Sequence, residues 1–234
     1  MKRAVLFDLG GTLVRYYSRG EFPTLLEQAI QEVESCLEQR GLLHLPGEEV
    51  RRRAGEENQE ASDFRVRPLE ERLARIFRLG ESETSGERLE ALCRCFMRPI
   101  LTLARRYDDT LPNLRRLRTE GYRVAIVSNT SWGSPAWLWR EEIARHGLAE
   151  WIDATVFCRD VGWRKPAPQI FTFALEQVEA RPEESLFVGD DYRWDVAGPR
   201  AVGIEAVLID RGGTAGDTAE RAIHGLDELW ARLC

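Results

Sequence analysis

An aspartate near the start of the chain stands where an α/β fold would place a chemically active group. Asp8 closes the apolar run of residues 4–7 and is followed by the turn Leu9-Gly10-Gly11-Thr12. Ligands of open α/β sheets bind outside the carboxyl ends of the strands, and glycines there let backbone N–H groups approach an anion closely. Asp8 is therefore a candidate nucleophile or metal ligand, although an aspartate that simply ends a strand would look the same in this segment alone.

Polar residues follow later strand-like runs and supply groups that suit phosphate chemistry. These residues are Ser128, Asn129, Lys165, Asp190, Asp191 and Asp195. Hydroxyl, amide and ammonium groups can bind phosphate oxygens, and carboxylates are ligands that Mg²⁺ prefers. The lysine is notable because Lys2 is the only other lysine among 33 Lys and Arg residues. A compact ammonium suits a place between a carboxylate and a phosphate, where a forked guanidinium would not fit.

The order of these groups, an aspartate, a serine, a lysine and then an acidic pair, resembles the four motifs of the haloacid dehalogenase-like (HAD) hydrolase superfamily. The resemblance extends from Asp8 to about Leu208, and four motifs in order make it specific. It implies a Rossmann-like core and, as the favoured activity, Mg²⁺-dependent hydrolysis of a small phosphorylated metabolite. Asp8 would form an aspartyl-phosphate, which divides one difficult displacement into two easier ones.

The resemblance also implies a metal site. Its ligands would be Asp8, the backbone carbonyl of Gly10 and Asp190. Asp195 would stand behind them and orient a metal-bound water or the motif lysine. Asp191 could replace Asp190 as a ligand, but the family spacing to Asp195 favours Asp190.

The phosphate and the reaction would be handled by a second set of groups. By resemblance, Ser128 and Lys165 act with the nucleophile in catalysis. The residues expected to bind the phosphate are Gly11, Thr12, Ser128, Asn129 and Lys165. Without the other motifs, Ser128 and Asn129 would be interpreted as an ordinary turn that ends a strand.

One position departs from the family pattern. HAD phosphatases commonly carry a second aspartate two residues after the nucleophile, which protonates the leaving group and later activates water; here that residue is Gly10. General acid–base catalysis is typically worth about 10²–10⁴ in rate. Either another group supplies the proton, with Tyr16, Tyr17 and Glu21 as candidates, or the enzyme prefers good leaving groups, or turnover is slow. Some sugar-phosphate phosphatases of the superfamily also have glycine here, so Gly10 weakens the phosphatase interpretation without removing it.

Three alternatives are weighed against a phosphatase. A 2-haloacid dehalogenase works without Mg²⁺, and it would leave Asp190 and Asp195 crowded near Asp8 with no cation to offset their charge. A phosphonoacetaldehyde hydrolase needs a lysine in the insert, and residues 16–107 contain none. A non-catalytic protein that binds a phosphorylated ligand stays open because of Gly10.

Apolar runs predict the elements that position these groups. Runs rich in Val, Ile, Leu, Phe and Ala are typical of buried parallel strands and occupy residues 4–8, 123–127, 154–158, 185–189 and 204–209. Helical periodicity lies between the later runs, at residues 137–147, 168–179 and 195–202. Alternating strands and helices predict an α/β fold with a doubly wound parallel sheet.

Residues 16–107 break this alternation. They are rich in Glu, Arg and Leu at helical spacing and predict about four helices. A helical insert directly after the nucleophile's turn resembles the HAD cap that lies between the first and second motifs. We therefore expect a core of residues 1–15 and 108–234 and a cap of residues 16–107. The interval from Ser128 to Lys165 is too short for a second large cap.

Three tryptophans lie within a few residues of the motifs. Trp132, Trp163 and Trp194 are expected near the strand ends that form the site. They could make an aromatic wall for a sugar or a base, or they could pack against the cap and the loops.

Composition limits the partners. A net charge of −6 and a pI near 5.4 give no electrostatic reason to expect a nucleic acid or an anionic membrane. The expected partner is a small phosphorylated molecule, and the chain is expected to be a monomer or a homodimer.

No apolar run reaches the roughly 20 residues that a membrane span needs. The first apolar run meets Asp8 too early for a signal peptide, so a cytoplasmic protein is expected. The five cysteines lack paired C-x-x-C spacing, which favours reduced thiols over a disulfide framework. Cys158 ends a strand-like run, but no histidine lies in another motif to activate it as a nucleophile.

Overall fold

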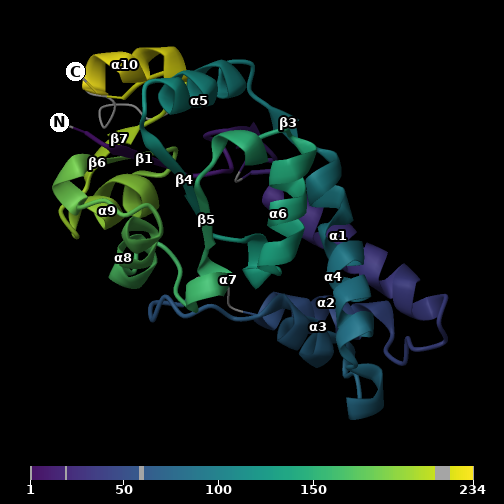
Figure 1. Ribbon diagram of the computed structural model, residues 1–234. Coiled ribbons are helices and arrows are strands. Elements are labelled where there is room, and N and C mark those ends of the chain that lie inside the picture. Colours follow the sequence, from purple (N-terminus) through teal and green to yellow (C-terminus); the bar gives the residue numbers. More distant parts are fainter. Residues whose placement is uncertain (1, 19, 58–60, 214–221, 234) are drawn as a thin grey trace.

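The computed structural model describes residues 2–18, 20–57, 61–213 and 222–233. At its centre is a sheet of five parallel strands in the order β5-β4-β1-β6-β7 (Figure 1). The strands are β1 (Ala4–Phe7), β4 (Arg123–Ser128), β5 (Ala154–Phe157), β6 (Ser185–Gly189) and β7 (Glu205–Leu208). The predicted fold class is confirmed, and each predicted strand is present with ends that differ by no more than one residue.

The strand order places the topological switch point of the sheet at the carboxyl end of β1, because later strands are added first on one side of β1 and then on the other. Its last residue, Phe7, pairs with Ile126 of β4 on one side and with Val188 of β6 on the other. The chain moves outward from β1 through β4 to β5, and then returns to the other side of β1 for β6 and β7. Open α/β sheets bind ligands at such a switch point, beyond the carboxyl ends of the strands. Asp8 follows β1 directly and therefore lies at that crevice.

Helices cover both faces of the sheet. In Figure 1, α5 and α10 lie on one side of the sheet, and α8 and α9 lie on the other. Alternate residues of β1 follow this division, because Val5 and Phe7 belong to one buried cluster while Ala4 and Leu6 belong to the other. These helices are α5 (Thr110–Thr119), α6 (Ala136–Arg145), α7 (Cys158–Val161), α8 (Pro168–Gln177), α9 (Gly198–Arg200) and α10 (Trp230–Leu233). Short 3₁₀ turns are η1 (Glu81–Glu83), η2 (Ser131–Gly133), η3 (Ala149–Trp151), η4 (Pro182–Glu184) and η7 (Leu226–Leu229).

The helix predicted at residues 195–202 differs from the structure. The chain forms a π-helical segment, η5 (Tyr192–Ala197), and only then the short helix α9. A π-helical turn widens the backbone ring and is frequent at functional sites. The apolar period alone cannot distinguish it from an α-helix, because both bury one side of the segment.

The segment between β2 and β3 is helical, as predicted. It contains α1 (Phe22–Glu38), α2 (Gly47–Glu56), α3 (Leu69–Phe77) and α4 (Gly86–Thr102), which extend away from the sheet in Figure 1. The chain leaves and returns through an antiparallel ribbon of β2 (Val14–Arg15) and β3 (Arg105–Arg106). The buried face of α1 includes Ala29, Ile30, Val33 and Leu37, a spacing that places them on one side of the helix. A separate cap of residues 16–107 stays a prediction.

The expectation of reduced cysteines is wrong for Cys36 and Cys95. The structure joins them in a disulfide that links α1 to α4 across 59 residues of sequence, with Cα atoms 6.8 Å apart. Such a pair depends on how two helices pack, so C-x-x-C spacing gives no signal for it. Cys93 and Cys158 are free and buried. Cys234 lies outside the described residues.

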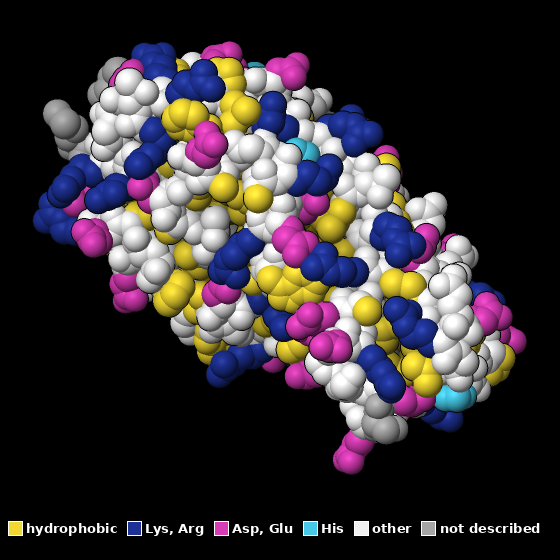
Figure 2. Space-filling view, turned by 45° about the vertical axis from the view of Figure 1, so that its right-hand side comes forward, with side chains coloured by type: hydrophobic (Ala, Val, Ile, Leu, Met, Phe, Trp, Pro, Cys, Tyr) yellow, Lys and Arg dark blue, Asp and Glu magenta, His cyan; other side chains and the backbone are white. Residues whose placement is uncertain are grey.

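The surface view agrees with the composition. On the face drawn in Figure 2, Lys and Arg side chains alternate with Asp and Glu, and they form no continuous basic band. Among the described residues, none of the helices combines the length and the apolar composition needed to cross a lipid bilayer.

Candidate active site

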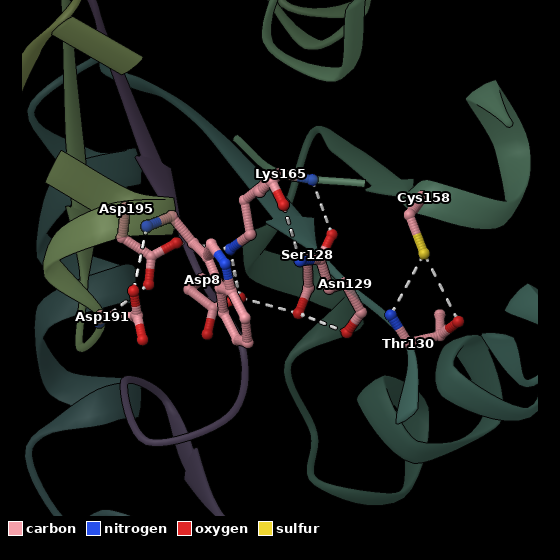
Figure 3. Close-up of polar contacts among 9 residues, drawn as sticks. Asp8, Ser128, Asn129, Thr130, Cys158, Lys165, Asp191 and Asp195 are labelled. Carbon is pink, nitrogen blue, oxygen red and sulfur yellow. Dashed lines mark hydrogen bonds and ion pairs between the residues drawn. The ribbon is translucent and has the colours of Figure 1, made fainter. Parts of the chain in front are cut away.

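Asp8 is held by two donors on the same oxygen. Ser128 Oγ donates a hydrogen bond to Asp8 Oδ1 at 2.7 Å, and Lys165 Nζ donates to the same atom at 2.7 Å (Figure 3). The serine ends β4 and the aspartate follows β1, so the parallel pairing of these strands brings the two side chains together. Both donors use Oδ1, which leaves Oδ2 as the oxygen directed to other partners.

Lys165 is buried between two carboxylates. Besides Asp8 it donates to Asp195 Oδ1 at 2.6 Å, and its side chain is only 2% exposed. Burial by itself lowers the pKa of the lysine, but the charges of Asp195 and Asp8 outweigh it and raise the pKa above its usual value. The group is therefore an ammonium at neutral pH. An unpaired buried charge would be costly, and the two carboxylates remove that cost.

Asn129 fixes the backbone that carries this lysine. Its Oδ1 accepts a hydrogen bond from Lys165 N at 2.8 Å, and its Nδ2 donates to Lys165 O at 3.3 Å. The side-chain amide predicted to bind phosphate is thus engaged with the lysine loop. The structure gives Asn129 a positioning contact that the sequence did not indicate.

Three carboxylates converge beside the lysine. Oxygens of Asp8, Asp190 and Asp195 all lie within 4.8 Å of one another. Two glycines allow this approach: a Cβ on Gly189 would lie 2.4 Å from the Cβ of Asp195, and a Cβ on Gly11 would lie 2.1 Å from Asp190 Oδ2. A Cβ at either position would displace one of these carboxylates from the cluster.

Crowding affects the protonation of these acids. Asp190 is exposed at the cavity, but desolvation by its neighbours, followed by the negative charges of Asp8 and Asp195, raises its pKa to about 8. Burial also raises the pKa of Asp195, and Lys165 opposes that shift. Three carboxylates therefore share one ammonium, and the excess negative charge favours a bound proton or a cation.

A divalent cation with oxygen ligands fits this arrangement. Mg²⁺ takes one or two carboxylates and keeps several waters, and Asp190 is open to solvent where it meets the cavity. Asp191 is used differently: its Oδ1 accepts from Trp194 N at 3.0 Å and caps η5. Its backbone N donates to Asp195 Oδ2 at 3.0 Å. The geometry therefore brings Asp190, and not Asp191, into the acidic cluster.

A cavity of ≈ 190 Å³ opens onto these groups. Its lining includes seven of the residues predicted for the site, which are Asp8, Gly10, Gly11, Ser128, Asn129, Lys165 and Asp190. Thr12 was predicted to bind phosphate, but it is fully buried and is not among the lining residues. Asp195 lies behind Lys165.

A family model for haloacid dehalogenase-like hydrolases matches residues 2–203. The chain belongs to this family. The predicted resemblance is confirmed. It is similar to the glyceraldehyde 3-phosphate phosphatase of Methanopyrus kandleri, with 27% identity over 91% of this chain and 85% of that protein.

The chain is also similar to a dehalogenase and to a phosphatase of known structure. (S)-2-haloacid dehalogenase 4A of Burkholderia cepacia is 30% identical over 54% of each chain. A crystal structure of a HAD phosphatase from Thermococcus onnurineus matches with a TM-score of 0.67 and 27% identity, over 100% of this chain and 98% of that one. The chain spans about half the length of the first curated relatives that it matches.

In this member of the HAD-like family, two tyrosines line the cavity that contains Gly10, the glycine that replaces the usual acid. A Cβ on Gly10 would lie 3.6 Å from Tyr16 Cδ2, so the ring of Tyr16 covers this position. The Tyr16 hydroxyl is buried and, among the described residues, has no hydrogen-bond partner. Tyr17 instead shares a 2.8 Å hydrogen bond with Ser131 Oγ. Glu21 is exposed, accepts from Ser18 N at 2.7 Å and is not among the cavity's lining residues.

The three tryptophans near the motifs divide between the two roles that were expected for them. Trp194 lines the cavity as expected. Trp132 instead stacks on Phe96 of α4 with centroids 5.4 Å apart, and Trp163 lies under Arg65 at 3.7 Å. Two other lining residues, Trp139 and Ser131, were missed. Trp139 lies on α6 with an apolar pattern that gives no hint of a cavity.

The loop after the nucleophile has an anchor that the sequence did not reveal. The Arg211 guanidinium donates to the Thr12 carbonyl at 2.9 and 2.7 Å and to Asp109 at 3.0 and 2.9 Å. It therefore ties the nucleophile's turn to the segment where the chain returns from the helical insert. More than 100 residues separate the partners in sequence, and no local pattern signals the contact.

Cys158 does not take part in the site. Its sulfur accepts from Thr130 N at 3.2 Å, away from Asp8 in Figure 3, and the side chain is fully buried. Burial raises the pKa of the thiol. A neutral, enclosed thiol is a poor nucleophile.

Proposed function

We propose that this protein is a Mg²⁺-dependent phosphatase that hydrolyses a small phosphorylated metabolite through an aspartyl-phosphate on Asp8. The observation that carries the proposal is the clustering of Asp8, Asp190 and Asp195 around a single buried ammonium, Lys165. The match to a glyceraldehyde 3-phosphate phosphatase over most of both chains supports the same reaction class.

The first half-reaction uses the free oxygen of the nucleophile. Asp8 Oδ2 attacks phosphorus, a new P–O bond forms to the carboxylate, and the bond to the leaving group breaks. Lys165 and the Ser128 hydroxyl are within hydrogen-bond distance of Asp8 and offset negative charge on the transferring phosphoryl group. In the second half-reaction, water attacks the same phosphorus and releases phosphate and the original carboxylate.

The metal is part of the proposal. Asp8, Asp190 and the Gly10 carbonyl would hold Mg²⁺, which would neutralise charge on the phosphoryl oxygens. Asp195 would keep Lys165 in place through its 2.6 Å contact. The leaving group of the substrate would contact the helical cap of residues 16–107, which borders the cavity through Tyr16 and Tyr17.

The acidic cluster favours this reaction over metal-free dehalogenation. A haloacid dehalogenase has no cation to balance three close carboxylates, and their mutual repulsion is unfavourable. Binding without turnover is the remaining alternative. It would follow if no group serves in place of the acid missing at Gly10.

One set of assays distinguishes the phosphatase, the dehalogenase and the non-catalytic binding protein. p-Nitrophenyl phosphate is incubated with the wild type and with Asp8→Asn, each with Mg²⁺ and with EDTA, and 2-chloropropionate is tested in parallel for halide release. We expect hydrolysis only with Mg²⁺ and only with Asp8 present. Halide release in EDTA would favour the dehalogenase, and phosphate binding without hydrolysis would favour the binder.

A further inference from the structure

Two hydroxyls on the cavity wall are paired with each other and not with the acidic cluster. Tyr17 and Ser131 both line the cavity that contains Asp8 and Lys165, and their hydroxyl oxygens lie 2.8 Å apart. They come from different parts of the chain. Tyr17 follows β2 at the entrance to the helical insert, and Ser131 begins η2, three residues after the serine that contacts Asp8.

Tyr16 provides a contrast within the same dipeptide. Its ring packs against the Gly10 position and meets Trp139 edge-on at 5.3 Å and 73°. Its hydroxyl has almost no accessible surface. Tyr16 therefore contributes an apolar wall, whereas Tyr17 and Ser131 contribute a pair of hydrogen-bonded hydroxyl groups at the cavity.

The side chains that line the cavity carry little positive charge. Among the described residues that line the cavity, Lys165 is the one cation, and it already contacts Asp8 and Asp195. The rest of the wall consists of three carboxylates, two glycines, hydroxyls, an amide and aromatic rings; the carboxylates are those of Asp8, Asp190 and Asp191. A second carboxylate brought in by a substrate would find no counter-charge and would lie near Asp8 and Asp190, which is unfavourable.

We propose that Tyr17 and Ser131 bind the leaving group of the substrate and select an uncharged, hydroxyl-bearing leaving group over a carboxylate. This inference rests on the proposed phosphatase function. A substrate hydroxyl can exchange hydrogen bonds with the pair without introducing charge, and its carbon chain can lie on the aromatic faces. The cavity volume of ≈ 190 Å³ restricts that chain to a short one.

The protonation of Tyr17 is consistent with this role. Burial raises the pKa of its phenol, and the hydrogen bond with Ser131 opposes the shift only in part. The hydroxyl is therefore a neutral donor at neutral pH. When the substrate supplies an acceptor, the phenol can donate to it while the serine hydroxyl turns to accept or donate as required.

The test compares two substrates with the same carbon skeleton. Glyceraldehyde 3-phosphate and 3-phosphoglycerate differ in an aldehyde against a carboxylate. We expect the wild type to prefer the aldehyde by at least about tenfold in kcat/KM, since a site built for a neutral polar group rejects a poorly paired one strongly. p-Nitrophenyl phosphate serves as a reference substrate that has no hydroxyl on its leaving group.

The variants localise the effect. Tyr17→Phe and Ser131→Ala should each lower kcat/KM for glyceraldehyde 3-phosphate by about tenfold more than for p-nitrophenyl phosphate, the loss expected for one hydrogen bond. The double variant should fall short of the product of the two losses because the groups act as a pair. Tyr122→Phe is the matched control, since it also removes a tyrosine hydroxyl but Tyr122 is not among the residues that line the cavity. It should keep the wild-type ratio between the substrates.

The outcomes separate this inference from the proposed function. Suppose that the wild type hydrolyses p-nitrophenyl phosphate in an Mg²⁺- and Asp8-dependent way but shows no preference for the aldehyde, or that both variants keep the wild-type ratio. The Tyr17–Ser131 inference is then overturned while the phosphatase proposal stands. If no phosphate ester is hydrolysed, both fail together. If one variant does not fold, the ratio measured with the other decides.

Discussion

The side-chain amide of Asn129 makes hydrogen bonds with both backbone groups of Lys165. Its Oδ1 accepts from the Lys165 N–H at 2.8 Å, and its Nδ2 donates to the Lys165 carbonyl at 3.3 Å. The contact joins the loop after β4 to the loop that carries the lysine, 36 residues later. An amide that closes such a ring fixes where the lysine side chain starts. The position of the ammonium between Asp8 and Asp195 therefore depends on a residue that need not touch the substrate.

Replacing Asn129 with alanine should impair catalysis more than substrate binding. A displaced lysine would lower kcat by about 10²-fold, the loss expected when a reacting group is misplaced by about 1 Å, with a smaller change in KM. Asn113→Ala is the control, because this buried asparagine also makes side-chain hydrogen bonds, to Asp109 and Asp227, but lies on α5. Equal kcat losses in both variants would show a general folding effect.

Lys165→Arg should be nearly as inactive as Lys165→Met. The lysine side chain is 2% exposed and its Nζ lies 2.7 and 2.6 Å from two carboxylates, so a planar guanidinium has no room. Loss of such a charge-stabilising donor costs about 10²–10³ in rate. Lys2→Arg, at the chain's only other lysine, should keep activity. Activity in Lys165→Arg within a few fold of the wild type would contradict the crowded geometry.

The sequence predicts those strands and helices whose burial produces a local pattern of apolar residues. The strands were found because a strand buried on both faces is a continuous apolar run, and the insert's helices because their buried residues recur every three to four positions. Among the motif residues, Asp8, Asn129 and Asp190 directly follow strands, whereas Lys165 lies beyond α7. Because the carboxyl ends of parallel strands meet at one edge of a sheet, the sequence predicts Asp8, Asn129 and Asp190 at the same edge.

The remaining features depend on packing between distant segments. The Cys36–Cys95 disulfide requires α1 and α4 to lie side by side, and the Arg211 anchor requires the segment after β7 to reach Thr12. The use of the Asn129 amide depends on the loop before α8. None of these three contacts produces a periodic pattern of residues, so the sequence does not predict them.

Mg²⁺ binding should strengthen as pH rises toward 8. Desolvation and the neighbouring charges of Asp8 and Asp195 raise the pKa of Asp190 to about 8 without metal, so below that pH a proton must leave before the carboxylate can bind a cation. The affinity should rise with pH and level off above the pKa. Calorimetry in two buffers with different ionisation enthalpies should detect proton release at pH 7. No release there would show that Asp190 is already ionised.

Reduction of the disulfide should destabilise the protein. Closing a loop of 59 residues is worth about 4 kcal/mol in the chain-entropy account. Dithiothreitol should lower the Tm of the wild type, and Cys36→Ser should lower it without reductant and remove any further effect of dithiothreitol. Cys93→Ala, at a free buried cysteine of the same helix as Cys95, should retain the response to reductant. A wild-type Tm that is the same with and without reductant would contradict the pairing.

Gly11→Ala should disable the metal site while leaving the fold in place. Gly11 has φ +75°, and a Cβ there would lie 2.1 Å from Asp190 Oδ2, so the carboxylate must move away from Asp8. We expect a loss of Mg²⁺ affinity of about 10-fold or more, as for other changes in the surroundings of metal ligands. Gly41→Ala is the matched control, because Gly41 has φ +66° and no atom within 4 Å of its Cβ position. It carries the same backbone strain of roughly 1 kcal/mol without the clash. If both variants lose Mg²⁺ affinity equally, strain alone explains the effect, and the close approach of Asp190 to the glycine turn does not matter for the metal.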